Sequence, residues 1–241
     1  MSEDLYSDYV RREPHPRNAV FIAKWHGKLL RLALKDEYPV KRILEIGPGH
    51  GYFAEHCKSN GLIYEFCDTS PAVFNKMEQL GYTGHLGLLS DLLPKLGKYD
   101  MVYMSHVIEH SPSWIDARKL LEDCQKVLSS NGKLVIVSPD LLSWKHEFWN
   151  VDWSHGYPTS VRNLSQLCSD VGYINIEAKH HRNGSSNIFV RGIFSLLAKI
   201  PHQPIDRIMT PTRYRLGDGF VYSWKAVFGW RQIFIKASAR D

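Results

Sequence analysis

Residues 43–51 read Ile-Leu-Glu-Ile-Gly-Pro-Gly-His-Gly, a short apolar run followed at once by alternating glycines. The apolar run predicts a buried strand, and Tyr52–Ser59 after the glycines predicts a helix. Glycine permits a tight turn between strand and helix and lets a ligand approach the backbone closely. Glycine-rich turns also occur where nothing binds, so this loop alone leaves ligand binding open.

The glycine spacing separates this loop from a dinucleotide-binding loop. The dinucleotide fingerprint is G-x-G-x-x-G, in which the third glycine allows the helix to pack closely on the strand. Here the glycines are Gly47, Gly49 and Gly51, and Tyr52 takes the position of that third glycine. Asp68 follows the next predicted strand, and a carboxylate there can accept two hydrogen bonds from a ribose diol. The pattern therefore indicates a nucleoside-containing ligand other than a dinucleotide.

The rest of the chain alternates between apolar runs of strand length and stretches with helical periodicity. Strands are predicted at 42–46, 63–67, 99–105, 133–138, 173–178 and 231–237, and helices at 17–35, 52–59, 71–80, 114–128 and 160–171. A turn is expected at Asn131-Gly132, immediately before the fourth of these strands. This order predicts an α/β fold, a doubly wound and mostly parallel sheet with helices on both faces.

We interpret the 241 residues as one domain. It comprises a lead-in with one helix (1–38), a core (39–181), an insertion (182–230) and a last strand (231–241). Hydrophobic residues make up 44% of the chain and no apolar run is long enough to span a membrane. The acidic N-terminus has no signal-peptide pattern, so a cytoplasmic protein is expected.

Charge and cysteine content exclude some classes of function. The net charge of +5 is mildly basic, but no dense stripe of Lys and Arg predicts nucleic-acid binding. The four cysteines form no C-x-x-C pair, so a zinc site of that kind is not expected and buried free thiols are.

Several motifs, in order along residues 40–178, resemble those of class I S-adenosylmethionine-dependent methyltransferases. Residues 44–51 resemble the first motif, Asp68 matches the ribose-binding acid, and Lys98–Ser105 resembles the fourth-strand motif. Residues 127–134 resemble the L-x-P-G-G-x-L turn, with Ser and Asn replacing the proline and first glycine, and 170–173 resembles the turn before the sixth strand. The resemblance implies a seven-stranded sheet with an antiparallel last strand.

The resemblance also implies S-adenosylmethionine as the cofactor and a set of residues that bind it. The family often has an acid in a G-D-A step that reads the adenine amino group, but Gly87-Leu88-Leu89 stands there, so Asp91 is the nearest acid. The expected cofactor-binding residues are Glu45, Gly47, Pro48, Gly49, Gly51, Asp68, Thr69, Leu89, Asp91, Ser105 and His106.

Two histidines are candidates for the base that an alcohol acceptor needs, because imidazole titrates near neutral pH. His110 follows the fourth strand, with Glu109 beside it to orient it. His155 follows the fifth strand, with Asp152 as its partner. Structural roles, capping or packing for His110 and a turn held by Asp152 and His155, stay open. Too few carboxylates lie near this loop to favour magnesium, and no metal ligands are assigned.

Aromatic residues gather around the second histidine, and aromatic rings stack on sugar or ring faces. They are Trp144, Phe148, Trp149, Trp153 and Tyr157, and a core beneath a lid is the alternative. Within the insertion, residues 188–200 form an apolar helical face that could pack in the core, cap the site, form a homodimer or contact the inner face of the membrane. The basic residues Arg207, Arg213 and Arg215 would strengthen such a membrane contact.

The expected function is methyl transfer to a hydroxyl of a sugar, polysaccharide or glycolipid-type acceptor. The aromatic segment, the basic charge balance and the resemblance to enzymes of surface-glycan synthesis favour this reading. A methyltransferase for a small aromatic or quinone-like metabolite is one alternative. A cofactor-binding interaction subunit without catalytic activity is another, because a fold does not determine a function.

Overall fold

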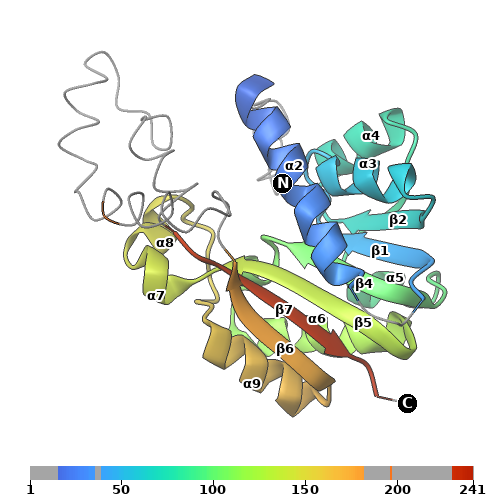
Figure 1. Cartoon of the computed structure of the whole chain (residues 1–241). Helices are drawn as coiled ribbons and strands as arrows, with labels where there is room; N and C mark the ends of the chain where they lie inside the picture. The colour runs from blue at the N-terminus through green and yellow to red at the C-terminus, as the bar shows by residue number, and fades with distance from the viewer. Residues whose placement is uncertain (1–15, 36–38, 182–195, 197–229, 241) are drawn as a thin grey trace.

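The computed structural model describes residues 16–35, 39–181, 196 and 230–240. Within these residues one sheet has the strand order β3-β2-β1-β4-β5-β7-β6 (Figure 1). Its strands are β1 (Arg42–Ile46), β2 (Ile63–Asp68), β3 (Thr83–Leu86), β4 (Tyr99–Ser105), β5 (Leu128–Pro139), β6 (Ile174–His181) and β7 (Gln232–Ser238). Neighbouring strands among β1–β5 are parallel, and β7 runs antiparallel to both β5 and β6. The predicted α/β class and the antiparallel last strand are confirmed.

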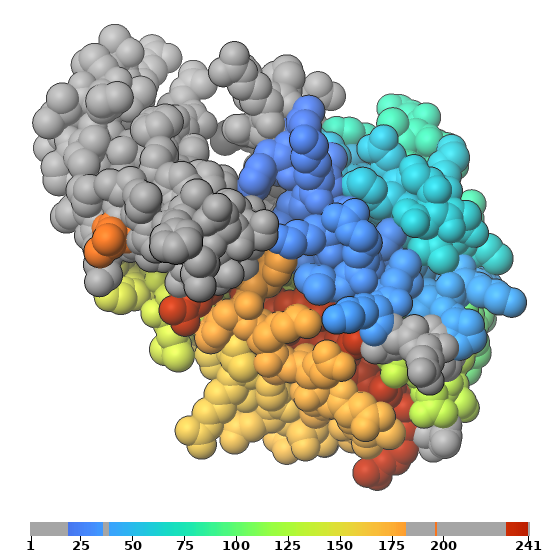
Figure 2. Space-filling model, in the orientation of Figure 1, coloured from blue at the N-terminus to red at the C-terminus, as the bar shows by residue number. Residues whose placement is uncertain are grey.

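Helices cover both faces of the sheet. They are α2 (Pro16–Ala33), α3 (Tyr52–Ser59), α4 (Pro71–Gln79), α5 (Leu89–Leu92), the 3₁₀ helix η1 (Ile108–His110), α6 (Trp114–Val127), α7 (Leu141–Trp144), α8 (Glu147–Asn150) and α9 (Val161–Val171). In the space-filling view α2 lies beside the cyan surface of α3 and α4, whereas α9 and β6 form the lower side of the molecule (Figure 2). The result is a three-layer arrangement.

The core follows from the alternation of side chains along each strand. Ile43 packs with the buried faces of α2, α3 and α4, and its neighbour Leu44 packs with those of α5, α6 and α9. In the first of these layers the rings of Phe53 and Tyr103 stack with centroids 3.7 Å apart. Both faces of the central strands are thus buried, which explains why their sequences are mostly apolar, with Glu45 in β1 and Asp100 in β4 among the exceptions.

Local sequence signals determine several helix ends. Ser70 caps α4 by accepting a hydrogen bond from the backbone N–H of Val73, and Pro71 occupies the first helical position, as predicted. Ser160 and Asn163 form a capping box at the start of α9, and Gly172 ends that helix with a φ of 102°. The predicted bounds of β1, α3 and β4 are confirmed.

The predicted turn at Asn131-Gly132 before a strand over 133–138 is wrong. β5 instead runs without interruption from Leu128 to Pro139, and its pairing with β4 shifts register between Tyr99 and Met101. Asn131 has a φ of 59°, so the residues that suggest a turn form an irregular stretch within the strand.

The sheet order brings the candidate residues together. β1 lies between β2 and β4, so the order of strands reverses at the β1–β4 pair. In open parallel sheets, ligands bind beyond the carboxyl ends of the strands at such a point. The loops after β1, β2, β4 and β5 meet at this edge.

Of the predicted insertion 182–230, the structure describes only Leu196 and Trp230, so the predicted helix over 188–200 and its basic flank lie otherwise outside the described residues. None of the described helices is long and apolar enough to cross a membrane. Cys57, Cys67, Cys124 and Cys168 are buried free thiols, as the sequence predicts.

Candidate active site at the carboxyl edge of the sheet

The glycine loop joins β1 to α3 through three residues with positive φ. Gly47, Gly49 and Gly51 have φ values of 69°, 56° and 80°, which residues with a Cβ rarely adopt. The N–H of Gly47 donates to the carbonyl of Cys67 on β2, and the N–H of Gly51 donates to that of Pro48. A Cβ on Gly47 would lie 2.6 Å from Cγ2 of Val107. The loop is thus a fixed turn that passes close to the segment after β4.

Asp68 lies at the same edge, one strand away. It ends β2, and its Oδ1 accepts a hydrogen bond of 2.8 Å from the N–H of Ser70. Since Ile46 pairs with Cys67, Asp68 is level with the start of the glycine loop. Thr69 beside it is exposed. This half-buried carboxylate has the position that the sequence predicts for a ribose ligand.

The predicted adenine-side residues follow β3. The side chain of Leu89 is 5% exposed and packs in the core, whereas Asp91 is exposed and accepts a hydrogen bond of 3.2 Å from Ser90. A cofactor contact by Leu89 would therefore involve its backbone. The roles of both residues remain predictions.

Glu45 is a buried carboxyl beneath the loop. Its Oε2 accepts a 2.5 Å hydrogen bond from the hydroxyl of Tyr64, and the residue is 1% exposed. Burial raises the pKa of Glu45 to about 8, although the hydrogen bond from Tyr64 opposes this change. Its carboxyl therefore supports the strand from which the loop departs, and a cofactor contact remains a prediction.

Glu45→Gln is expected to remove a pH dependence of stability. The unfolded chain ionises Glu45 near pH 4.5, but the folded chain retains the proton until about pH 8, so the free energy of unfolding should fall as pH rises between these values. Wild type should lose on the order of 2 kcal/mol more than Glu45→Gln between pH 5 and 7.5 in urea titrations. Glu55→Gln, at an exposed position on α3, is the control. Equal slopes in all three proteins would contradict the assignment.

His106 begins the segment after β4 in a left-handed conformation, with a φ of 56°. Its N–H donates to the carbonyl of Val137 on β5, and its Nδ1 lies 3.1 Å from Oε1 of Glu109. The preceding Ser105 ends β4 and is half-buried. The backbone strain at His106 is of the kind found at ligand-binding positions.

Sequence reasoning missed two residues of α2 that lie at this edge. The ring of Trp25 is 6.1 Å from that of His106, and the ring of His26 is 6.3 Å from that of Tyr52. Burial, with a contribution from the nearby His106, lowers the pKa of His26 to about 3, so this imidazole is neutral. The apolar periodicity of α2 predicts only a core helix. The adjacent tryptophan and histidine in that helix were the sequence signal that could have indicated a place at the ligand-binding edge of the sheet.

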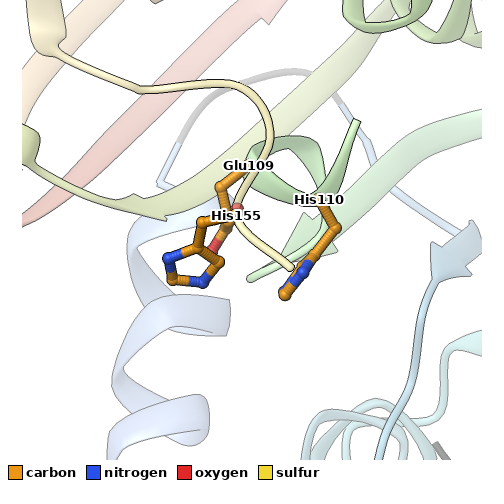
Figure 3. A group of neighbouring side chains, drawn as sticks. All are labelled: Glu109, His110 and His155. Atoms are coloured by element: carbon orange, nitrogen blue, oxygen red, sulfur yellow. The ribbon is translucent and has the colours of Figure 1, made fainter. Parts of the chain in front are cut away.

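The residues after β4 and β5 form a compact cluster, shown in Figure 3. Glu109, His110 and His155 each offer one donor atom, and these atoms lie within 4.8 Å of one another. Glu109 and His155 are buried, and His110 is half-buried. The two imidazole rings meet edge to face with centroids 4.8 Å apart. The structure thus brings together three of the four residues predicted for catalysis, from segments about 45 residues apart.

The side chain of Asp152 is connected through Ser154 to His110. Its Oδ1 accepts hydrogen bonds from both the N–H (2.9 Å) and the hydroxyl (2.6 Å) of Ser154. The Ser154 hydroxyl also lies 2.8 Å from Nδ1 of His110. The side chain of Ser154 thus connects Asp152 to His110, whereas His155 contacts Asp152 through its backbone N–H, which lies 3.4 Å from the carbonyl oxygen of Asp152. This backbone contact fits the turn that the sequence leaves open, and a catalytic role for Asp152 beside His155 remains a prediction.

Hydrogen bonds fix the tautomer of both imidazoles. Ser154 gives its single hydroxyl proton to Asp152, so it must accept from Nδ1–H of His110. His155 donates from Nδ1 to the carbonyl of Phe148. Both rings therefore carry the lone pair on Nε2. Burial lowers the pKa of His110 against the pull of Glu109, which favours its neutral form.

Glu109 remains ionised although it is fully buried. Burial acts to raise the pKa of Glu109, but the contacts with His106 and His110 outweigh it and hold the pKa below its ordinary value. The hydroxyl of Ser138 donates to Oε2 at 3.1 Å. Glu109 therefore places a negative charge directly beside the two imidazoles.

The aromatic residues divide into two groups. Trp144 stacks on Trp230 at 4.5 Å, and Phe148 and Tyr157 are buried. Trp149 and Trp153 are 46% and 77% exposed. Three of the five predicted aromatics thus belong to the interior, and two can meet an acceptor.

The comparisons with known proteins agree with this architecture. A family model described as a methyltransferase domain matches residues 17–178. Among curated protein sequences, none matches this chain.

Several solved structures share the fold. A SAM-dependent methyltransferase from Archaeoglobus fulgidus is 19% identical, with a TM-score of 0.62 over 90% of this chain and 94% of that one. The N-methyltransferase NodS from Bradyrhizobium japonicum, in complex with S-adenosylhomocysteine, is 15% identical, with a TM-score of 0.62 over 99% and 100%. Phosphoethanolamine N-methyltransferase 2 from Haemonchus contortus, in complex with S-adenosylmethionine, is 17% identical, with a TM-score of 0.60 over 100% and 61%.

Proposed function

The chain belongs to the methyltransferase-domain family, and from this premise we propose that it transfers the methyl group of S-adenosylmethionine to a hydroxyl of a sugar-type acceptor. The observation that carries the proposal is the position of the Glu109–His110–His155 cluster at the same sheet edge as the glycine loop. The glycine loop provides a surface for a nucleoside ligand, and the Glu109–His110–His155 cluster provides groups that can act on a hydroxyl.

The residues at this edge fit the cofactor. Gly47 and Gly49 have positive φ angles and are partly exposed, so a ligand can approach their backbone atoms closely. Asp68, level with that turn on the adjacent strand, offers a carboxylate for the ribose hydroxyls. S-adenosylmethionine would supply an electrophilic methyl group on its sulfonium, and the protein would supply position and electrostatics.

An alcohol acceptor also has to lose its proton as the new O–C bond forms. The Nε2 lone pairs of His110 and His155 can receive such a proton, because hydrogen bonds to Ser154 and Phe148 occupy both Nδ1 atoms. The ionised Glu109 would stabilise the resulting imidazolium. The cluster thus supports methylation of an oxygen.

The acceptor class rests on the two exposed tryptophans near the cluster. Trp149 and Trp153 are exposed and shortly precede His155 in the chain. Indole rings stack on the apolar faces of sugars. The net charge of +5 suits an acceptor that carries phosphate or carboxylate groups.

Methyl transfer from cofactor labelled in its methyl group tests the proposal. The purified full chain should transfer label to a glycan extract, and Asp68→Asn should lower both this transfer and the affinity for S-adenosylhomocysteine at least about tenfold. The Asn keeps an Oδ1 that can accept from Ser70 while losing the charge. Label in a quinone extract alone would replace the sugar acceptor by an aromatic one. Binding of cofactor with no label in any extract would contradict the enzymatic function.

A further inference from the structure

We propose that Glu109, His110 and His155 bind a divalent transition-metal ion. The claim that they bind an ion rests on the geometry of the three side chains alone. The role of the ion in catalysis rests on the proposed function.

The three side chains already converge on one point. Glu109 and His110 project from η1, and His155 projects from the loop that passes over it (Figure 3). Their donor atoms lie within 4.8 Å of one another, whereas bonds of about 2.0–2.1 Å to a shared ion would place them about 3–3.5 Å apart. Small side-chain rotations cover this difference. An ion here would connect two segments distant in sequence.

Groups behind the three donors orient them as they do in metal sites. A histidine that binds a metal through one nitrogen usually donates its other N–H to a carbonyl or to a group linked to a carboxylate. His155 donates to the carbonyl of Phe148, and His110 donates to Ser154, which is itself held by Asp152. Both rings thus present Nε2, the nitrogen with the lone pair.

The carboxylate is held in a similar way. Oε2 of Glu109 accepts from Ser138, and Oε1 lies 3.1 Å from Nδ1 of His106. Each oxygen of an ionised carboxylate has two lone pairs, so one contact at each oxygen leaves capacity for an ion.

The donor set selects the class of metal. Two imidazoles and one carboxylate suit zinc and its first-row neighbours, whereas magnesium and calcium prefer oxygen ligands. Three protein ligands leave at least one position for a further group, as in catalytic rather than structural zinc sites. A cation there would lower the pKa of an acceptor hydroxyl. The imidazoles would then act as ligands, and the proton would pass to solvent.

Metal binding by the full chain, measured without cofactor or acceptor, tests the inference. After chelation and dialysis, Zn²⁺ titrated by calorimetry should bind at about one ion per chain. Glu109→Gln, which keeps the shape of the side chain, and His110→Gln should each weaken binding at least about tenfold. Ser154→Ala should weaken it less, because it removes only the support of His110. His85→Gln, on β3 at the far end of the parallel part of the sheet, is the matched control.

Cobalt provides a second measurement. Co²⁺ in place of Zn²⁺ should give visible absorption bands that Glu109→Gln removes and His85→Gln retains, and excess Mg²⁺ should not displace the ion. Equal Zn²⁺ affinity in the wild type, Glu109→Gln and His110→Gln would overturn the inference.

The outcomes separate this inference from the proposed function. Specific Zn²⁺ binding without methyl transfer to any extract would contradict the function and leave the metal site standing. Label transfer that is unchanged in chelated protein, together with nonspecific Zn²⁺ binding, would overturn the metal site alone.

Discussion

Gly47→Ala is expected to abolish detectable binding of S-adenosylhomocysteine. Two costs combine at this position. Its φ of 69° is unfavourable by about 1–2 kcal/mol for a residue with a Cβ. The new Cβ would also lie 2.6 Å from Cγ2 of Val107, so either the glycine turn or the segment after β4 has to move. Calorimetry should show a loss of affinity of at least about 100-fold, which corresponds to about 2.7 kcal/mol.

Gly61→Ala separates these two costs. Gly61 has the same φ of 69°, but a Cβ there meets no atom within 4 Å. This variant should lose about 1 kcal/mol of stability and bind cofactor normally. The double variant Gly47→Ala/Val107→Ala should recover part of the affinity, because it removes the clashing methyl groups. Normal binding by Gly47→Ala would show that the loop does not contact the cofactor.

The contrast between β1 and β3 shows which parts of the fold were predictable. β1, the glycine loop and α3 are each determined by adjacent residues, so their bounds follow from the sequence. β3 contains only Thr83-Gly84-His85-Leu86, which shows no strand pattern of its own. Its pairing with β2 stabilises these residues as a strand. A Cβ on Gly84 would lie 2.2 Å from the ring of Phe66, so the glycine is required by a distant aromatic residue. No local pattern encodes such a contact.

The candidate site was likewise predictable only where the residues themselves carry a signal, and not where it depends on contacts between distant residues. Glu109, His110 and His155 are recognisable from their residue types and from their positions after strands. The connection of Asp152 to His110 through Ser154 joins positions 44 residues apart in the chain, and a serine carries no signal of its own. Trp25 and His26 appeared as members of an amphipathic helix, because their position over the carboxyl edge depends on how α2 packs against α3.

Replacing His110 or His155 is expected to reduce methyl transfer by about 10²–10⁴-fold while leaving cofactor affinity within about twofold. The reason is that both groups act on the acceptor oxygen, whether by receiving its proton or by holding a cation that favours proton loss. His110→Ala and His155→Asn are suitable, because the Asn side chain can still donate to the carbonyl of Phe148 and limits the cavity left in the buried position. Initial rates with labelled cofactor, paired with calorimetry of S-adenosylhomocysteine, measure the two effects separately.

His146→Ala is the matched control, since this histidine lies on the same segment as His155 but its side chain is 76% exposed. It should retain full activity. Ser154→Ala should reduce the rate by a smaller factor, about three- to tenfold, since it removes only the support of the His110 ring.

The rate of the double variant then shows whether His110 and His155 act as one catalytic unit or independently. If the two histidines act together on one oxygen, the double variant His110→Ala/His155→Asn should be little slower than the slower single variant, because either change already disables the cluster. Independent contributions of the two histidines to the rate would instead multiply the two losses. A double variant that loses the product of both factors, or single variants with unchanged rates, would contradict the assignment of the Glu109–His110–His155 cluster as the place where the acceptor is activated.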